Sequence, residues 1–238
     1  MKKWLLPLLC AFPLAASSQE MVGQLGSRTA LLTLHTVQQP DGGWRVTGEY
    51  MVLPTLQRRF LEGERSPQLG VTTLKEGTTP ILFGHDPTGE LRGTWRAGTF
   101  KGTRYGPGGQ ERERFEFSEE FPSMEGYSGT VRCEAADEGR YSSSLSYSVE
   151  SGSIKAFEWR SRVRPGGHSC ELSGLQQQPL KGGLRLASGE CSVTLRALGE
   201  AVKIAAEGCS AQCDSQAYPE PMLVERRGSC RLLRPEAR

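Results

Sequence analysis

Apolar and polar residues alternate with a period of two along much of this chain of 238 residues. The pattern is clearest over residues 141–150, where large apolar side chains hold most odd positions and serines hold most even ones. Residues 44–50, 91–97 and 191–197 show the same alternation. Because successive side chains of an extended strand point to opposite faces, this period predicts strands with one buried and one polar face.

Glycine-rich turns separate these segments at short intervals. They include Asp41-Gly42-Gly43, Gly106-Pro107-Gly108-Gly109 and Ser188-Gly189. Short connections favour antiparallel hairpins, since parallel strands need long crossover segments, and no stretch carries a sustained helical stripe. The sequence therefore predicts an all-β fold, with an antiparallel meander or barrel-like N-terminal part followed by a disulfide-stapled, β-rich C-terminal part.

The cysteines are confined to one half of the chain. Apart from Cys10, they are Cys133, Cys170, Cys191, Cys209, Cys213 and Cys230. This asymmetry predicts a cysteine-free β-domain over residues 19–125 and a stapled β-domain over 126–238, which ends in a short basic tail. An even number of cysteines in an exported chain predicts three disulfides.

Spacing suggests one set of pairings among the alternatives that these cysteines allow. Cys209 and Cys213 are close in sequence, and Cys170 and Cys191 flank an expected hairpin. Cys133 and Cys230 would then form the third disulfide.

Residues 1–18 have the features of a secretory signal peptide. Lys2 and Lys3 precede a short apolar run, and small residues at 15–18 suit cleavage after Ser17 or Ser18. Cys10 leaves lipid attachment open as an alternative to a leader residue lost on cleavage. The apolar run is too short to span a bilayer, which takes about 20 residues. A periplasmic or secreted protein with no membrane span is expected.

Loss of this leader changes the charge balance. Removing Lys2 and Lys3 from the 29 basic residues leaves 27, which equals the 27 acidic residues. A mature chain with no net charge has no general attraction for nucleic acid or anionic lipid. We therefore expect no nucleic-acid partner, and instead an unknown protein or small-molecule ligand in the cell envelope.

Residues that would support catalysis are few. The histidines are His35, His85 and His168, and neither a G-x-S-x-G elbow nor a phosphate-binding glycine loop is present. The adjacent Glu119 and Glu120 are expected to face solvent. Cys209 and Cys213 lack the second close pair that a structural zinc site requires. We expect a non-enzyme without cofactor or metal, and a secreted hydrolase with an unrecognised site is the alternative.

Two short motifs resemble known families. The loop that contains Ser151, Gly152, Ser153 and Lys155 resembles the serine-glycine-serine loop, with nearby lysine, of periplasmic inhibitors of chicken-type lysozyme. In that family the loop enters the lysozyme cleft and meets its catalytic carboxylates, a task that suits hydroxyl and ammonium donors. The tyrosine that follows the loop in that family is absent here. This resemblance implies a non-catalytic binding or inhibitor module with those four residues as its site.

The triplet Gly93-Thr94-Trp95 resembles the G-x-W motif of lipocalins. In that family the triplet lies near the start of the barrel, whereas here it falls in the middle of the expected domain. The resemblance implies a barrel that carries a small ligand in its mouth, as an alternative to the inhibitor.

Overall fold

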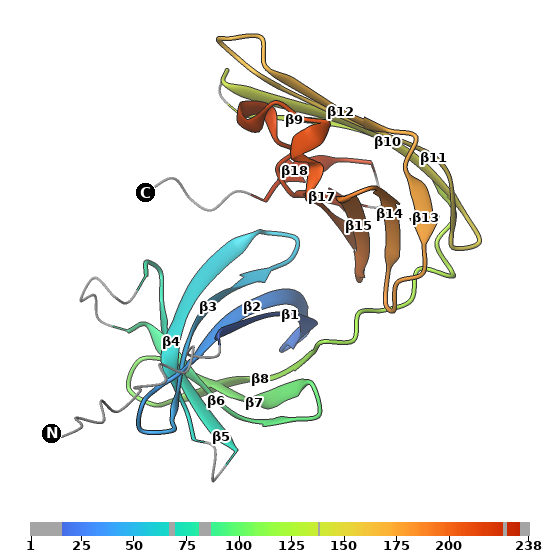
Figure 1. The fold of residues 1–238 in the computed structure, drawn as a ribbon. Coiled ribbons are helices and arrows are strands. Elements are labelled where there is room, and N and C mark those ends of the chain that lie inside the picture. Colours follow the sequence, from blue (N-terminus) through green and yellow to red (C-terminus); the bar gives the residue numbers. More distant parts are fainter. Residues whose placement is uncertain (1–15, 67–69, 81–86, 138, 226–227, 234–238) are drawn as a thin grey trace, which may run out of the picture. The chain divides into compact units, whose positions relative to one another are not determined.

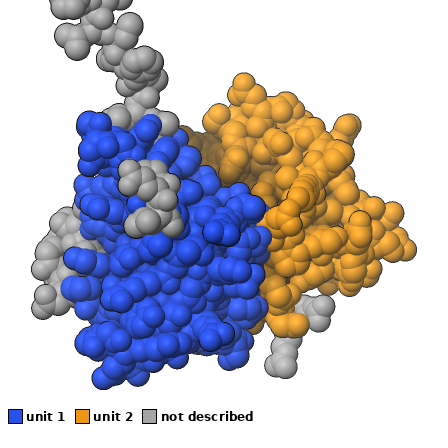
Figure 2. All heavy atoms as spheres, turned by 90° about the horizontal axis from the view of Figure 1, so that it is seen from below, with its two compact units in different colours: residues 1–119 blue, residues 120–238 orange. Residues whose placement is uncertain are grey.

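The computed structural model describes residues 16–66, 70–80, 87–137, 139–225 and 228–233. The chain forms two compact units, Met1–Glu119 and Glu120–Arg238 (Figures 1 and 2), where the sequence suggested a division after residue 125. Most of the expected leader, including Cys10, lies outside the described residues, as does His85.

The first unit is a closed antiparallel barrel of eight strands in sequence order (Figure 1). Its strands are β1 (Ala16–Leu25), β2 (Arg28–Gln38), β3 (Trp44–Val52), β4 (Gln57–Arg65), β5 (Val71–Gly77), β6 (Gly89–Arg96), β7 (Thr99–Tyr105) and β8 (Glu111–Ser118). The first and last strands close the barrel by pairing Val22 with Ser118 through to Leu25 with Phe115. The barrel-like N-terminal part expected from the sequence is therefore confirmed.

Apolar side chains from the strands fill the centre of the barrel. Trp95 and Phe100 stack with ring centroids 5.6 Å apart, and Phe115 lies 4.8 Å from Phe100. Glycine lets neighbouring strands approach closely around this core. A Cβ atom on Gly23 or Gly102 would lie only 1.9 Å from a carbonyl oxygen of the next strand, so a larger residue at either position would displace the backbone.

The second unit contains two antiparallel sheets. The four-stranded sheet has the order β12-β11-β10-β9, and the six-stranded sheet runs from β13 to β18 in sequence order. The strands are β9 (Gly129–Ala136), β10 (Tyr141–Glu150), β11 (Ser153–Val163), β12 (Ser169–Ser173), β13 (Gln176–Gln178), β14 (Leu184–Ser188), β15 (Cys191–Leu198), β16 (Ala201–Glu207), β17 (Met222–Glu225) and β18 (Cys230–Leu232). Two short 3₁₀ helices, η2 (Cys209–Ala211) and η3 (Ser215–Ala217), lie between β16 and β17.

One apolar cluster holds this unit together. It joins Leu145 and Trp159 of the four-stranded sheet to Val193, Ile204 and Met222 of the six-stranded sheet. Along β10 the odd positions are buried and the even positions are half-buried or exposed, as the period-two pattern predicted.

All six cysteines of the second unit form disulfides, but only one of the three suggested pairings is right. Cys133 pairs with Cys230, whereas Cys170 pairs with Cys213 and Cys191 with Cys209.

The proposed pairing of Cys209 with Cys213 is wrong because the two residues belong to the same helical turn. The amide of Cys213 donates to the carbonyl of Cys209 at 3.0 Å, and each side chain bonds a cysteine of a different sheet. Cys170 and Cys191 likewise do not flank one hairpin, because β12 belongs to the four-stranded sheet and β15 to the six-stranded sheet.

Three disulfides are typical of a protein that folds in an oxidising compartment outside the cytoplasm. Within the described residues, no helix combines the length and the apolar character needed to cross a membrane.

Candidate binding site

The loop selected from the sequence is a tight turn between β10 and β11. Glu150 pairs with Ser153, which leaves Ser151 and Gly152 as the two turn residues. Both have positive φ angles, 47° and 73°, as a type I′ turn requires. Glycine adopts this conformation freely, but serine does so at a cost, and such residues persist where the surrounding structure holds them.

Several hydrogen bonds hold this turn in place. The amide of Ser151 donates to Ser128 Oγ at 3.1 Å. The side chain of Gln177 accepts from the amide of Ile154 at 2.7 Å and donates to the carbonyl of Gly152 at 3.4 Å. The backbone of the hairpin tip is therefore fixed by neighbouring segments, while the side chains of Ser151 and Ser153 are exposed.

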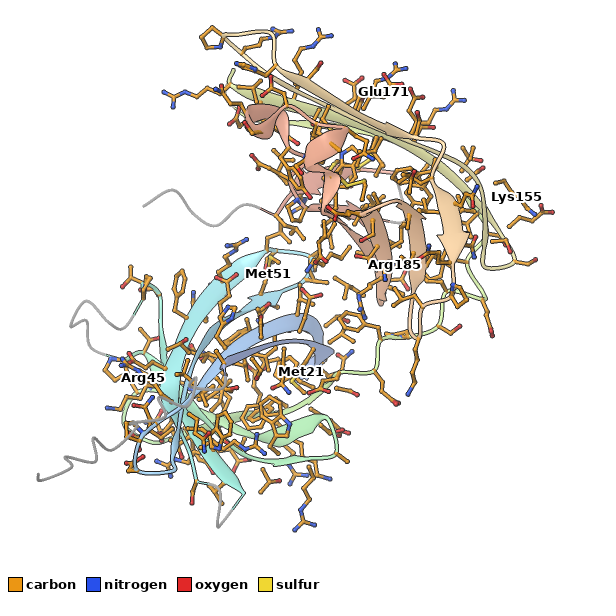
Figure 3. All side chains as sticks on the ribbon, in the orientation of Figure 1. Met21, Arg45, Met51, Lys155, Glu171 and Arg185 are labelled. Atoms are coloured by element: carbon orange, nitrogen blue, oxygen red, sulfur yellow. A yellow bond between two sulfur atoms is a disulfide. The ribbon has the colours of Figure 1, made fainter. Side chains whose placement is uncertain are left out.

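Lys155 occupies a β-bulge just after the turn. Ser148 pairs with Ala156 and Val149 with Ile154, so Lys155 has no partner on β10. Bulges redirect side chains, and Lys155 projects away from the sheet (Figure 3). Its Nζ atom lies 3.8 Å from Glu150 Oε2, and both side chains are mostly exposed, so this ion pair holds the lysine only weakly. The hairpin thus presents two hydroxyls and an ammonium group at one end.

A second feature, the outer face of the four-stranded sheet, was not selected from the sequence. Two overlapping hollows of about 580 and 380 Å³ lie along this face and share Glu134, Ser144 and Arg160. Ser142, Ser144 and Ser146 of β10 lie in their floor. The alternation over 141–150 placed these serines on one face, but sequence alone could not show that the face is hollowed.

Charged residues flank the serine row on both sides. The strand register aligns Ser144 with Glu134 of β9 and with Arg160 of β11. One step along the sheet, Ser146 aligns with Arg132 and with Glu158. Small side chains on the central strand therefore lie between long ones on its neighbours, which accounts for the trough.

The two histidines that the structure describes, His35 and His168, do not form a recognisable catalytic centre. His35 is exposed on β2. His168 Nδ1 forms a close contact with Asp214 Oδ2, and this hydrogen bond, together with one from the amide of Gln216, lowers the pKa of Asp214. Asp214 also caps η3. Among the described residues, no hydroxyl or thiol is hydrogen-bonded to His168, so the pair lacks an adjacent nucleophile of the kind that a triad requires.

The adjacent carboxylates Glu119 and Glu120 point to different partners. Glu119 accepts a hydrogen bond from Gln19 at 2.9 Å, and Glu120 forms an ion pair with Lys181. Both are exposed, as expected. In the described part of the chain, no group of three or more histidine, cysteine or acidic residues could hold a metal ion.

Among the described residues of the barrel, Glu76 is a fully buried carboxylate. Tyr50 donates its hydroxyl to Glu76 Oε2 at 2.7 Å, and Arg104 binds both carboxylate oxygens through Nε and Nη2 at 2.7 and 2.8 Å. Burial and the nearby Glu76 raise the pKa of Tyr50, and the hydrogen bonds to Glu76 raise the pKa of Arg104. Arg59 adds a longer contact of 3.5 Å.

This network continues toward the barrel surface. Arg104 also donates to Glu113 at 3.0 Å, and Glu113 in turn pairs with Arg28 at 3.0 Å. Glu76 already has partners on both oxygens, as a buried charge requires. The arrangement therefore supports a structural role for Glu76 inside the barrel.

Comparisons with known proteins add no relative: no family model, curated protein or solved structure matches this chain.

Proposed function

We propose that this protein is a non-catalytic binding or inhibitor module, exported to the periplasm or secreted, which engages a carboxylate-bearing protein target through the tip of the β10–β11 hairpin. The main support for this proposal is a turn whose backbone is held in place and whose hydroxyl and ammonium donors are exposed. Ser151, Ser153 and Lys155 lie within five residues on a backbone held by Ser128 and Gln177.

This geometry suits recognition of a carboxylate. Two hydroxyls and an ammonium group can all donate to carboxylate oxygens, and hydrogen bonds to a charged acceptor are stronger than neutral ones. A loop that is already ordered loses less conformational entropy on binding. The exposed Lys155 would exchange its weak contact with Glu150 for a closer one in a desolvated cleft.

The proposed location rests on two features. The first is the signal-like composition of residues 1–18. The second is the set of three disulfides, which require an oxidising environment to form.

Titration against chicken-type lysozyme tests the proposal, because the target cleft carries catalytic carboxylates. We expect inhibition by the native chain and a loss of at least about tenfold in affinity for the triple variant Ser151→Ala/Ser153→Ala/Lys155→Ala, since bonds to charged groups are being removed. The matched control is Ser188→Ala/Lys101→Ala, which removes an exposed hydroxyl and an exposed ammonium elsewhere.

Two results would count against the proposal. Absence of any lysozyme binding by the native chain would reject this target. Unchanged inhibition by the triple variant would reject the hairpin tip as the binding site.

A further inference from the structure

The outer face of β10 carries four serine hydroxyls. Ser142, Ser144, Ser146 and Ser148 are half-buried at successive outward positions, and in the described part of the chain none of their hydroxyls has a hydrogen-bond partner. Strands favour threonine over serine. Four serines in this row therefore keep the face polar with side chains smaller than threonine.

Serines on the inner face of the same sheet behave differently. Ser143 Oγ accepts a hydrogen bond from the indole of Trp159 at 2.7 Å, and Ser161 Oγ bonds the carbonyl of Ala217. These buried hydroxyls form hydrogen bonds with polar groups in the core. The outward hydroxyls have no such structural use, which leaves them available to a ligand.

The charged residues beside this row are balanced in sign. They are Arg132, Glu134, Glu158, Arg160, Arg162 and Glu171. Arg160 is held between Glu158 and Glu171, the latter at 3.4 Å, and Figure 3 shows Glu171 on the outer side of the sheet. Within the described residues, Arg132, Glu134 and Arg162 have no ion-pair partner, so donors and acceptors are both available.

This chemistry narrows the class of ligand. A strongly acidic or basic ligand would meet as many like charges as opposite ones. An apolar ligand would leave the serine hydroxyls and charged groups without hydrogen bonds, which is unfavourable. An uncharged ligand with many hydroxyl groups can donate to the glutamates and accept from the arginines that flank Ser142, Ser144 and Ser146.

We propose that this trough, floored by Ser142, Ser144 and Ser146, binds an uncharged oligosaccharide that lies along β10. Ser142 to Ser146 span about 14 Å at a strand rise of ~3.4 Å per residue, which provides room for a short oligosaccharide. The site is separate from the hairpin tip, and it does not depend on the function proposed for that tip.

The test is a titration of the full chain with three uncharged tetrasaccharides: cellotetraose, maltotetraose and N-acetylchitotetraose. Binding is followed by backbone amide chemical shifts and by calorimetry. We expect at least one sugar to shift amides of β9, β10 and β11 around Ser144. The variant Ser142→Val/Ser144→Val/Ser146→Val keeps strand-forming residues and should weaken binding about tenfold or more by removing hydrogen bonds.

Two control variants show whether sugar binding belongs to the trough alone. Ser188→Ala should bind the sugar normally, and so should the hairpin variant Ser151→Ala/Ser153→Ala/Lys155→Ala. An unchanged thermal transition of the valine variant shows that lost binding is not lost folding.

Three outcomes would overturn the proposal. They are no shift with any of the three sugars, shifts confined to residues outside the trough, and tighter binding of an uncharged glycine-serine peptide than of any sugar. Loss of sugar binding in the hairpin variant would also reject the trough as an independent site.

Discussion

The two units stabilise β-sheets in different ways. The barrel closes its ladder by pairing β1 with β8, so each of its eight strands has a neighbour on both sides. It contains no cysteine among its described residues and places an ionic network around Glu76 inside. The second unit has two open sheets, and it joins them with apolar packing and three disulfides. Closure removes exposed sheet edges, whereas open sheets depend on links between layers.

The disulfides provide two covalent links between the two sheets of the second unit. Cys133 of β9 is bonded to Cys230 of β18, which joins the four-stranded sheet to the six-stranded sheet. The segment around η2 forms a second link, because Cys209 is bonded to Cys191 and Cys213 to Cys170. We infer that loss of a disulfide would loosen the second unit and leave the barrel intact.

Removal of the disulfide between Cys133 and Cys230 should have the largest effect. It closes a sequence separation of 97 residues, so the variant Cys133→Ala/Cys230→Ala should lose about 4–5 kcal/mol of unfolding free energy in the chain-entropy model. Urea denaturation measures this loss. A Trp159→Phe background leaves Trp44 and Trp95 to report the barrel, and a Trp44→Phe/Trp95→Phe background leaves Trp159 to report the second unit.

The matched control is Cys191→Ala/Cys209→Ala, which opens a separation of 18 residues. The same model gives a smaller loss, about 3 kcal/mol. A shift of the barrel transition in either variant would contradict the independence of the two units. Equal losses in both variants would contradict an entropic origin of the effect.

Neutralisation of the buried carboxylate in the barrel should have the next largest effect. In Glu76→Gln, the partly exposed Arg104 loses a charged acceptor and keeps Glu113, and Arg59 loses a nearby opposite charge. Because the arginines are partly exposed and Arg104 stays paired, the expected loss is that of hydrogen bonds to a charged group, about 1.5–3 kcal/mol. We expect the Trp44 and Trp95 transition to move to lower urea while the Trp159 transition stays in place.

The exposed Glu120→Gln variant is the control for this substitution, because it removes an ion pair with Lys181 on the surface. We expect little change in either transition. If Glu76→Gln were as stable as the native chain, the network around Glu76 would contribute nothing to the stability of the barrel.

Much of the fold could be predicted because its strands expose one face and bury the other. Over Tyr141–Glu150 the buried odd positions match the pattern in the sequence. Glu76 could not be recognised in this way. It shares the inward face of β5 with Thr72 and Leu74, and a glutamate in a strand is normally expected to face water. The burial of Glu76 becomes evident only from its partners, Tyr50 on β3 and Arg104 on β7.

The disulfide pairing failed for a related reason. Proximity in sequence favoured Cys209 with Cys213, but pairing depends on which sheet each strand joins. The hairpin tip could be found from sequence, since turns are encoded by adjacent residues. The trough beside it depends on the alignment of β9, β10 and β11, which only the three-dimensional register provides.

The smallest expected effect concerns acid stability of the second unit. The hydrogen bonds from His168 and Gln216 lower the pKa of Asp214 in the folded state. A carboxylate with a lowered folded pKa stabilises the fold above its unfolded pKa, and this contribution is lost as the pH falls through the folded pKa. The variant Asp214→Asn should therefore show a weaker dependence of the Trp159 transition on pH in this acidic range.

His168 and Asp214 both belong to the second unit. Asp214 is exposed and follows Cys213, so its loss should change only the second unit and only slightly. Urea midpoints measured from neutral to acidic pH, with Glu171→Gln as an exposed control, provide the measurement. An equal pH dependence in Asp214→Asn and the native chain would show that the contact between His168 and Asp214 contributes nothing to folding. A changed pH dependence of the barrel would show instead that the two units are energetically coupled.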